Sequence, residues 1–246
     1  MTDRIEVLPL PVAGEIGAGT DLAELVLAAA PPLRDGDVVV VAHKAVSKSE
    51  GRVVDLATVT PSARALELSQ EGGDPRMAEL VLRESRGIVR RRAGLLIAET
   101  HHGFVCASAG VDRSNGPAAG WAVLLPVDPD ASAARLRAAL ERRSGGARLA
   151  VVVADTMGRA LRRGIVGTAI GASGLDALRS YAGTVDPAGY ELRTTAVAVA
   201  DELASAADLV LGKLERVPAA LIRGFDARGE GSGRDLIRDP AEDLFR

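Results

Sequence analysis

The chain has 246 residues, of which 47% are hydrophobic and 2% aromatic, and a formal net charge of −3. This length supports a sizeable core, built from aliphatic side chains, in one large domain or two closely joined subdomains. The weak negative charge and the few aromatic rings argue against nucleic acid or a membrane surface as a partner. One cysteine, Cys106, no signal-peptide pattern and no apolar run of membrane-spanning length predict a cytoplasmic protein.

The N-terminal segment predicts a strand over residues 5–10, followed by a glycine-bearing loop. That loop lacks the Gly-Lys-Ser/Thr ending of a P-loop and does not match G-x-G-x-x-G, so neither phosphate-binding motif is present. Thr20 and Asp21 are suited to cap the helix that follows, which ends before Pro31-Pro32. Residues 38–42 are too apolar for a half-exposed strand and predict one that is buried on both faces.

The segment after this strand, residues 43–52, is basic and rich in hydroxyl groups. Its lysines could bind phosphate as point charges, although a solvated loop is the simpler interpretation. Residues 61–92 predict mostly helix, broken at 72–75, with a solvated basic face at 90–92. Residues 95–98 and 104–107 predict two strands.

The region between and after these two strands offers two candidate metal sites. His101 and His102 have no further ligand at the spacing of a zinc motif, so a turn is the better interpretation. Asp112 and Asn115 could form an ordinary Asx turn. Alternatively, Asp112 could pair with a second carboxylate at a strand end, and two such carboxylates can hold metal-bound phosphates.

That second carboxylate is Asp155, which follows an unbroken apolar run containing three consecutive valines. A strand over 121–127 and a helix from Asp128 to Leu140 lead the chain to this run. Ligands bind at strand ends in open α/β sheets, and Asp155 with Thr156 would supply hard oxygen ligands for Mg²⁺ or Mn²⁺ there. Helix capping by the same two residues is an equally good interpretation at this stage. The nearby arginines at 159, 162 and 163 could contact phosphate oxygens.

The last third of the chain is less regular. Residues 164–174 are small and glycine-rich, and residues 175–181 predict one helical turn or more. Residues 192–199 alternate in polarity, a helix is expected from Asp201, and residues 219–222 predict a last strand. Residues 226–233 are polar and glycine-rich, which is typical of a flexible end or linker.

Taken together in chain order, these motifs resemble the coenzyme F420-0:L-glutamate ligase family from about Ile5 to Phe225. The similarity is specific because it rests on several motifs rather than one. The matching stretches are residues 36–41 (GDVVVV), 45–48 (AVSK), 50–52 (EGR), 110–115 (GVDRSN), 124–126 (LLP), 155–159 (DTMGR) and 198–202 (AVADE).

The resemblance implies a mixed α/β (α+β) fold of two intertwined subdomains with mixed sheets, spanning residues 1–225, and a tail or linker over 226–246. It also implies a homodimer and a ligase that adds L-glutamate to the lactyl carboxylate of F420-0. In the family, GTP phosphorylates that carboxylate with the help of Mg²⁺ or Mn²⁺, and the glutamate amine then displaces phosphate from the acyl phosphate. A bound K⁺ is a further expected cofactor.

The family's site residues carry over onto matching positions of this chain. The implied metal ligands are Asp112, Asp155 and Thr156, and the two aspartates are also the expected catalytic residues. The residues implied in nucleotide binding are Ala13, Gly14, Glu15, Ile16, His43, Lys48, Asn115 and Lys213. In-line transfer of a phosphoryl group needs charge neutralisation more than a protein nucleophile, so the acidic and basic residues agree with this chemistry.

Three positions depart from the family pattern. His43 replaces a hydroxyl residue, Lys213 replaces a glutamine near the metals, and residues 165–167 read Ile-Val-Gly instead of Gln-Thr-Asp. We expect restoration of that triplet to increase glutamate ligation unless the chain has repacked around apolar groups. Two alternatives follow from these departures: another metal-dependent, nucleotide-using acid–amine ligase, or a catalytically silent protein that binds an F420 precursor.

Overall fold

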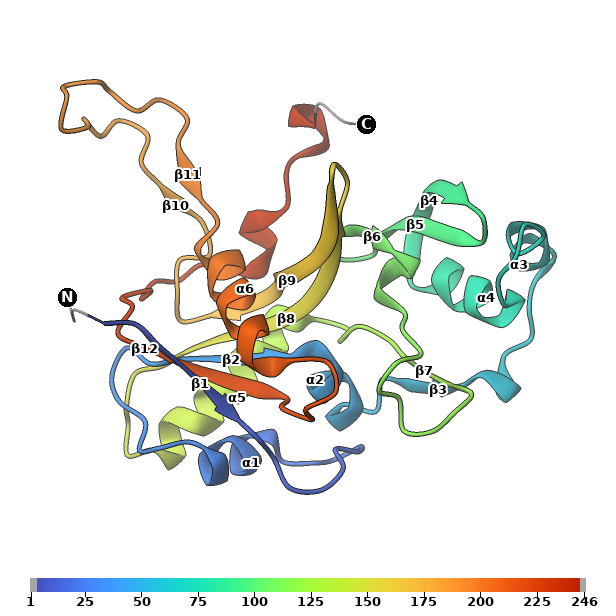
Figure 1. Cartoon of the computed structure of the whole chain (residues 1–246), viewed down its shortest axis with the longest axis horizontal. Helices are drawn as coiled ribbons and strands as arrows, with labels where there is room; N and C mark the ends of the chain where they lie inside the picture. The colour runs from blue at the N-terminus through green and yellow to red at the C-terminus, as the bar shows by residue number, and fades with distance from the viewer. Residues whose placement is uncertain (1–3, 244–246) are drawn as a thin grey trace.

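A five-stranded mixed sheet forms the centre of the larger part of the molecule (Figure 1). The computed structural model describes residues 4–243. The central strands β2 and β8 run parallel, and the other neighbouring pairs are antiparallel. In spatial order the strands are β1 (Glu6–Leu10), β12 (Ala219–Arg223), β2 (Val38–Ala42), β8 (Ala150–Arg159) and β9 (Arg162–Ser173). The predicted mixed α/β class is confirmed.

Helices cover both faces of this sheet, which explains why its central strands are continuously apolar. Val39 and Val41 share a core cluster with Leu140 of α5 on one face. Val40 shares a second cluster with Ala204 of α6 on the other face. The covering helices are α1 (Leu22–Ala29), α5 (Pro129–Arg143) and α6 (Val199–Leu211). The prediction that residues 38–42 and the run before Asp155 are buried strands is therefore confirmed.

The smaller part of the molecule has its own core and lies beside the main sheet (Figure 1). Leu56, Leu80 and Ala98 lie at its centre. The chain enters this part after α2 and returns to the main sheet through α5, so the two parts are intertwined. Its elements are β3 (Val53–Asp55), η1 (Leu56–Thr58), α3 (Ala63–Leu68), α4 (Pro75–Arg83), β4 (Ser85–Arg92), β5 (Leu95–Thr100), β6 (Val105–Ala107), η2 (Ser108–Gly110) and β7 (Trp121–Val123).

Two predicted elements in the first half are wrong. The segment after β2 is not a loop but the helix α2 (His43–Ser49), whose apolar residues Ala45 and Val46 pack into the main core. Residues 85–92 are strand rather than helix, because β4 pairs with β5 through a two-residue turn at Ala93-Gly94. Edge pairing outweighs the helical propensity of the arginines there.

In the second half, the glycine-rich segment 164–174 belongs to the long strand β9, which forms a hairpin with β8. At two of its glycines the backbone of a neighbouring helix lies so close that there is no room for a Cβ atom. A Cβ at Gly167 would lie 2.3 Å from the carbonyl oxygen of Ala204, and one at Gly171 would lie 2.4 Å from that of Pro129. Residues 175–181 do not form the predicted helix; they lead into the short pair β10 (Arg179–Ser180) and β11 (Ala196–Val197).

An arm of chain between β10 and β11 projects away from the body (Figure 1). The C-terminal segment contains η3 (Gly233–Leu236) and η4 (Pro240–Glu242). Within the segment that the sequence marks as a tail, Gly233 packs on β9, and its N–H donates to Asp130 Oδ1 at 2.7 Å. Across residues 4–243, no helix is both long and apolar enough to span a membrane.

Candidate functional site

The segments predicted to form the site lie at one edge of the main sheet. Ala42 at the end of β2 is in register with Ala154 of β8, so the residues that follow both lie at this edge. Leu10 at the end of β1 pairs with Ala219 at the start of β12, which places the loops 11–16 and 212–218 at the same edge. The N–H of Ala42 donates to Pro218 at 2.8 Å and ties the edge together.

Asp155 lies within β8 and faces the start of α2. Strand pairing continues to Arg159, so the helix-capping interpretation of Asp155 and Thr156 is wrong. The N–H of Thr156 donates to Asp155 Oδ1 at 2.7 Å, and His43 Nε2 lies 3.2 Å from the same oxygen. Burial opposes ionisation of this carboxyl, but His43, the Thr156 N–H and the charge of Lys44 together lower the pKa of Asp155.

His43 is 2% exposed, and neither of its ring nitrogens makes a hydrogen bond within the described residues. The contact with Asp155 is close but lacks hydrogen-bond geometry. Buried polar groups are nearly always bonded to protein, water or ligand. An imidazole with unused bonding capacity beside a carboxylate therefore indicates a place where a further polar group would be stabilised.

Asp112 reaches the same edge from the smaller part of the molecule. Its backbone bonds to Val123 in both directions, at 3.0 and 2.8 Å, which fixes its position beside β7. Lys44 Nζ donates to the Asp112 carboxylate and to Ser114 Oγ, the latter at 2.6 Å. Burial raises the pKa of Asp112, but the hydrogen bonds from Lys44 and Ser114 outweigh it and lower the pKa. The Ser114 N–H also donates to Asp112 Oδ1 at 2.8 Å, so the predicted Asx turn is present.

Lys44 joins the two carboxylates electrostatically; the sequence interpretation gave it only as one of the lysines of residues 43–52 that could bind phosphate, and missed its link to the carboxylates. It hydrogen-bonds Asp112, and its charge contributes to lowering the pKa of Asp155. The available signal was its position immediately after a buried strand, in the same segment as Lys48. Ser114 was also missed, although it lies within the motif that contains Asp112 and Asn115.

The carboxylates at this edge are of the kind that bind a hard divalent cation. Asp112 and Asp155 offer carboxylate oxygens, which Mg²⁺ and Mn²⁺ prefer, whereas Thr156 is the next residue on β8 and its side chain lies on the opposite face of the strand from Asp155. Lys44 already forms an ion pair with Asp112, so a metal ion bound there would share this carboxylate with the lysine. Among residues 4–243, no three His, Cys, Asp or Glu side chains form a ready-made cage. Bound Mg²⁺ usually keeps several waters and substrate phosphate oxygens, so a small protein donor set is sufficient.

The residues expected to bind nucleotide differ in their burial and in their contacts with the rest of the chain. Lys48 is half-buried on α2, and its ammonium group makes no ion pair or hydrogen bond in the described part of the chain. Asn115 is exposed and has a left-handed φ of 54°. Glu15, in the loop that also holds Ala13, Gly14 and Ile16, pairs with Arg216 at 3.1 Å. Lys213 pairs with Asp208 at 3.0 Å.

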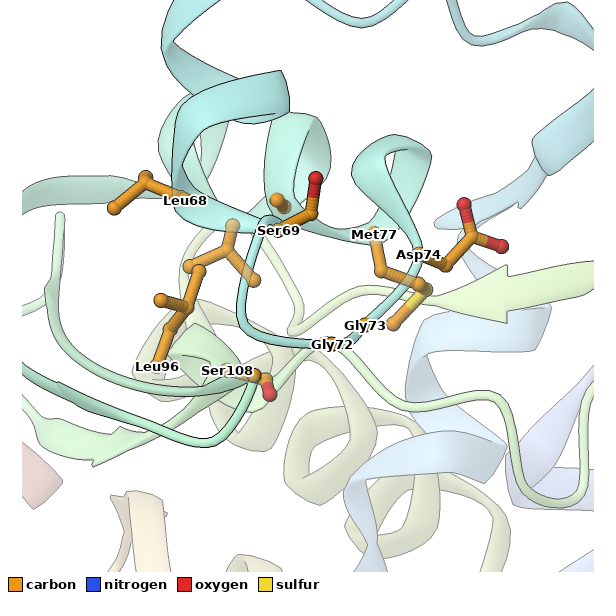
Figure 2. Close-up of a pocket in the computed structure, with 11 residues that line it drawn as sticks. Leu68, Ser69, Gly72, Gly73, Asp74, Met77, Leu96 and Ser108 are labelled. Atoms are coloured by element: carbon orange, nitrogen blue, oxygen red, sulfur yellow. The ribbon is translucent and has the colours of Figure 1, made fainter.

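Two hollows stand out in the described structure. One, of about 210 Å³, lies beside the β8–β9 hairpin and is lined by Met157, Thr168 and Asp201 among others. The other, of about 40 Å³, lies in the smaller part against Met77 and Ser108 (Figure 2). The smaller hollow has room for little more than water, and none of the predicted site residues lines it.

The fold and this edge define a class: a mixed α/β protein with two carboxylates and a lysine together at one edge of its main sheet. Comparison with known sequences identifies a particular family within this class. The profile of the F420-0:Gamma-glutamyl ligase family matches residues 12–224, and the chain belongs to this family. The resemblance read from the sequence is thereby confirmed.

Similar relatives share nearly the full length of the chain. The coenzyme F420:L-glutamate ligase of Methanopyrus kandleri is 44% identical over 100% of this chain and 98% of its own length. That of Methanocaldococcus jannaschii is 44% identical over 99% of this chain and 97% of its own. The ligase of Methanothermobacter thermautotrophicus is 43% identical over 98% of this chain and 97% of its own length.

Proposed function

We propose that this protein is a ligase that joins L-glutamate to the lactyl carboxylate of F420-0, with GTP as the phosphoryl donor and Mg²⁺ or Mn²⁺ as cofactor. Family membership and the relatives' names support the ligase and its acceptor. The observation that most supports the phosphoryl-transfer step is the convergence of Asp112, Lys44 and Asp155 at one sheet edge.

The reaction has two steps in this proposal. An oxygen of the lactyl carboxylate attacks the γ-phosphorus of GTP, and GDP leaves. The glutamate amine then attacks the acyl carbon, and phosphate leaves as the amide bond forms. A divalent cation held by Asp112 and Asp155 would neutralise the phosphate oxygens. Positioning and charge stabilisation account for most of the catalysis in such transfers, so no protein nucleophile is required.

The chain's own residues have separate tasks. The Thr156 N–H holds the Asp155 carboxylate in one orientation, with His43 beside it, and Lys44 with Ser114 holds Asp112. Lys48 has no protein partner in the described chain, so its ammonium is free to bind a phosphate oxygen of the nucleotide. Lys213 would have to leave Asp208 to do the same.

A second copy of the chain is the proposed partner. The arm between β10 and β11 holds both tyrosines of the sequence. Tyr190 is 63% exposed and Val185 64% exposed, on a segment that projects from the body (Figure 1). Exposed apolar side chains on a projecting segment indicate an interaction surface, and a homodimer would cover it.

The direct test is mass spectrometry of F420-0 incubated with the protein, L-glutamate, GTP and Mn²⁺ or Mg²⁺. We expect a product heavier by one or more glutamyl residues, and no product when nucleotide or metal is omitted. Glutamylation of other acids but not of F420-0 would favour the broader acid–amine ligase. Tight binding of F420-0 without product in the complete mixture would favour the silent binding protein.

A further inference from the structure

The larger hollow lies between elements that are distant in sequence. Its walls come from the start of β6, the β8–β9 hairpin, the start of α6 and the C-terminal segment, and its volume is about 210 Å³. The residues that matter here are Phe104, Met157, Thr168, Asp201, Ile237 and Arg238. None of them belongs to the metal or nucleotide groups described above.

This hollow opens next to Asp155. Thr168 is the register partner of Asp155 across the hairpin, so their Cα atoms are roughly 5 Å apart. Met157 lies two residues beyond Asp155 on the same strand and therefore on the same face. Both line the hollow. A molecule held there would lie beside the carboxylate at which the phosphorylated acid is expected to form.

Three charged groups line the hollow, the carboxylates of Asp201 and Asp243 and the guanidinium of Arg238, and Asp201 and Arg238 are not paired with each other. Asp201 Oδ1 accepts the Ala169 N–H at 2.8 Å, and its Oδ2 accepts no hydrogen bond from the described residues. Burial raises the pKa of Asp201 more than this bond lowers it, so a nearby cation would stabilise the ionised form. Arg238 is exposed at the rim and makes no ion pair within residues 4–243.

We propose that this hollow binds the acceptor amino acid, L-glutamate, with its ammonium group at Asp201 and one carboxylate at Arg238. Phe104, Met157 and Ile237 would contact the methylene groups between the charges. The proposal deepens the proposed function and rests on it. A small amino acid with an ammonium group and carboxylates matches the size of the hollow and the presence of both signs of charge in its walls.

The position agrees with the second step of the reaction. The glutamate nitrogen must come within about 3–3.5 Å of the acyl carbon. The nitrogen–carbon bond forms, the carbon–oxygen bond to phosphate breaks, and hydrogen phosphate leaves. Of the two protons that the ammonium group loses, one departs with the phosphate and one goes to solvent.

Methyl NMR tests occupancy without requiring turnover. The chain has three methionines, and Met157 lines this hollow while Met77 lines the small one in Figure 2. In protein labelled with ¹³C at the methionine methyls, L-glutamate should shift the Met157 resonance, assigned with Met157→Leu, and leave Met77 in place. An unmoved Met157 resonance at saturating glutamate would overturn the proposal, whether or not the protein is a ligase.

Kinetics and matched variants test the two charges. Asp201→Asn removes the negative charge but keeps a side-chain oxygen that can accept the hydrogen bond from the Ala169 N–H. Arg238→Gln removes the positive charge and keeps a polar side chain. Each should raise the KM for glutamate at least tenfold, change the KM for GTP less than twofold and reduce the Met157 shift. The controls Glu202→Gln, in the same helical turn, and Arg142→Gln, exposed on α5, should behave as wild type.

The outcomes separate this proposal from the proposed function. A Met157 shift that Asp201→Asn and Arg238→Gln weaken, in a protein that forms no glutamyl product, would support the site and refute the ligase. Product formation with glutamate KM values unchanged in both variants would support the ligase and overturn this site.

Discussion

Gly167 should tolerate no side chain in the β8–β9 hairpin. A Cβ there would lie 2.3 Å from the Ala204 oxygen, 2.7 Å from the Ala204 carbonyl carbon and 3.0 Å from the Ser205 nitrogen. These are backbone atoms of α6, and Ala204 is fully buried, so the helix itself would have to move. The Gly167 carbonyl also accepts a bond from Ser205 Oγ at 2.8 Å, which fixes the approach of the two elements.

Gly167→Ala should therefore destabilise the protein by about 1–3 kcal/mol, the usual cost of overpacking. For a chain of this size that corresponds to a loss of about 2–12 °C in melting temperature. Gly167→Asp should cost more because it adds a buried carboxylate. Restoration of Gln-Thr-Asp at 165–167 is thus expected to lower stability before it can improve ligation.

Differential scanning calorimetry of matched variants measures this effect. Gly158→Ala is the control, since a Cβ at Gly158, on the facing strand, would have no neighbour within 4 Å. Ile165→Gln is a second control, because Ile165 is 54% exposed. A Gly167→Ala protein as stable as the Gly158→Ala protein would refute the steric argument.

Four further predictions follow from particular side chains. Asp155→Asn should keep the fold but weaken Mn²⁺ binding by calorimetry and abolish turnover, because an amide is a poorer ligand than a carboxylate; normal metal affinity and turnover would contradict its role. Lys48→Ala should raise the KM for GTP or lower kcat with little change in melting temperature, and a collapse of stability with normal kinetics would make Lys48 structural. Ala93→Asn should stabilise the protein by about 1 kcal/mol, since Ala93 has a φ of 47° in a two-residue hairpin turn that prefers Asn-Gly, and a lower melting temperature would contradict this. Tyr190→Glu combined with Val185→Glu should shift the mass in light scattering from dimer to monomer, whereas an unchanged mass would show that the arm does not form the interface.

The buried strands and the acidic motif could be predicted from sequence because they depend on local pattern. The apolar runs in β2 and β8 are continuous because α5 and α6 cover both faces of the sheet. The long strand β9 could not be predicted in this way. Its glycines have low strand propensity, and they are accommodated because α6 and Pro129 approach at Gly167 and Gly171.

In the candidate site, too, some residues could be predicted from local sequence and others depend on tertiary contacts. Asp155 and Asp112 follow apolar segments and could be proposed from the sequence alone. The contact of Lys44 with Asp112 became visible only with the structure, because this bond between α2 and the Asp112 loop joins residues 68 positions apart. Asp201 was expected as the start of a helix and as part of the matching stretch 198–202, and its place in a hollow beside Asp155 depends on the tertiary contact with β9.

Oxygen-isotope transfer tests the central claim most directly. F420-0 labelled with ¹⁸O in the lactyl carboxylate is incubated with the protein, L-glutamate, GTP and Mn²⁺, and the released phosphate and the product are analysed by mass spectrometry. An acyl-phosphate ligase must move one ¹⁸O from the carboxylate to phosphate for each amide formed. Glutamylated product with unlabelled phosphate, or labelled F420-0 recovered unchanged from the complete mixture, would contradict the account.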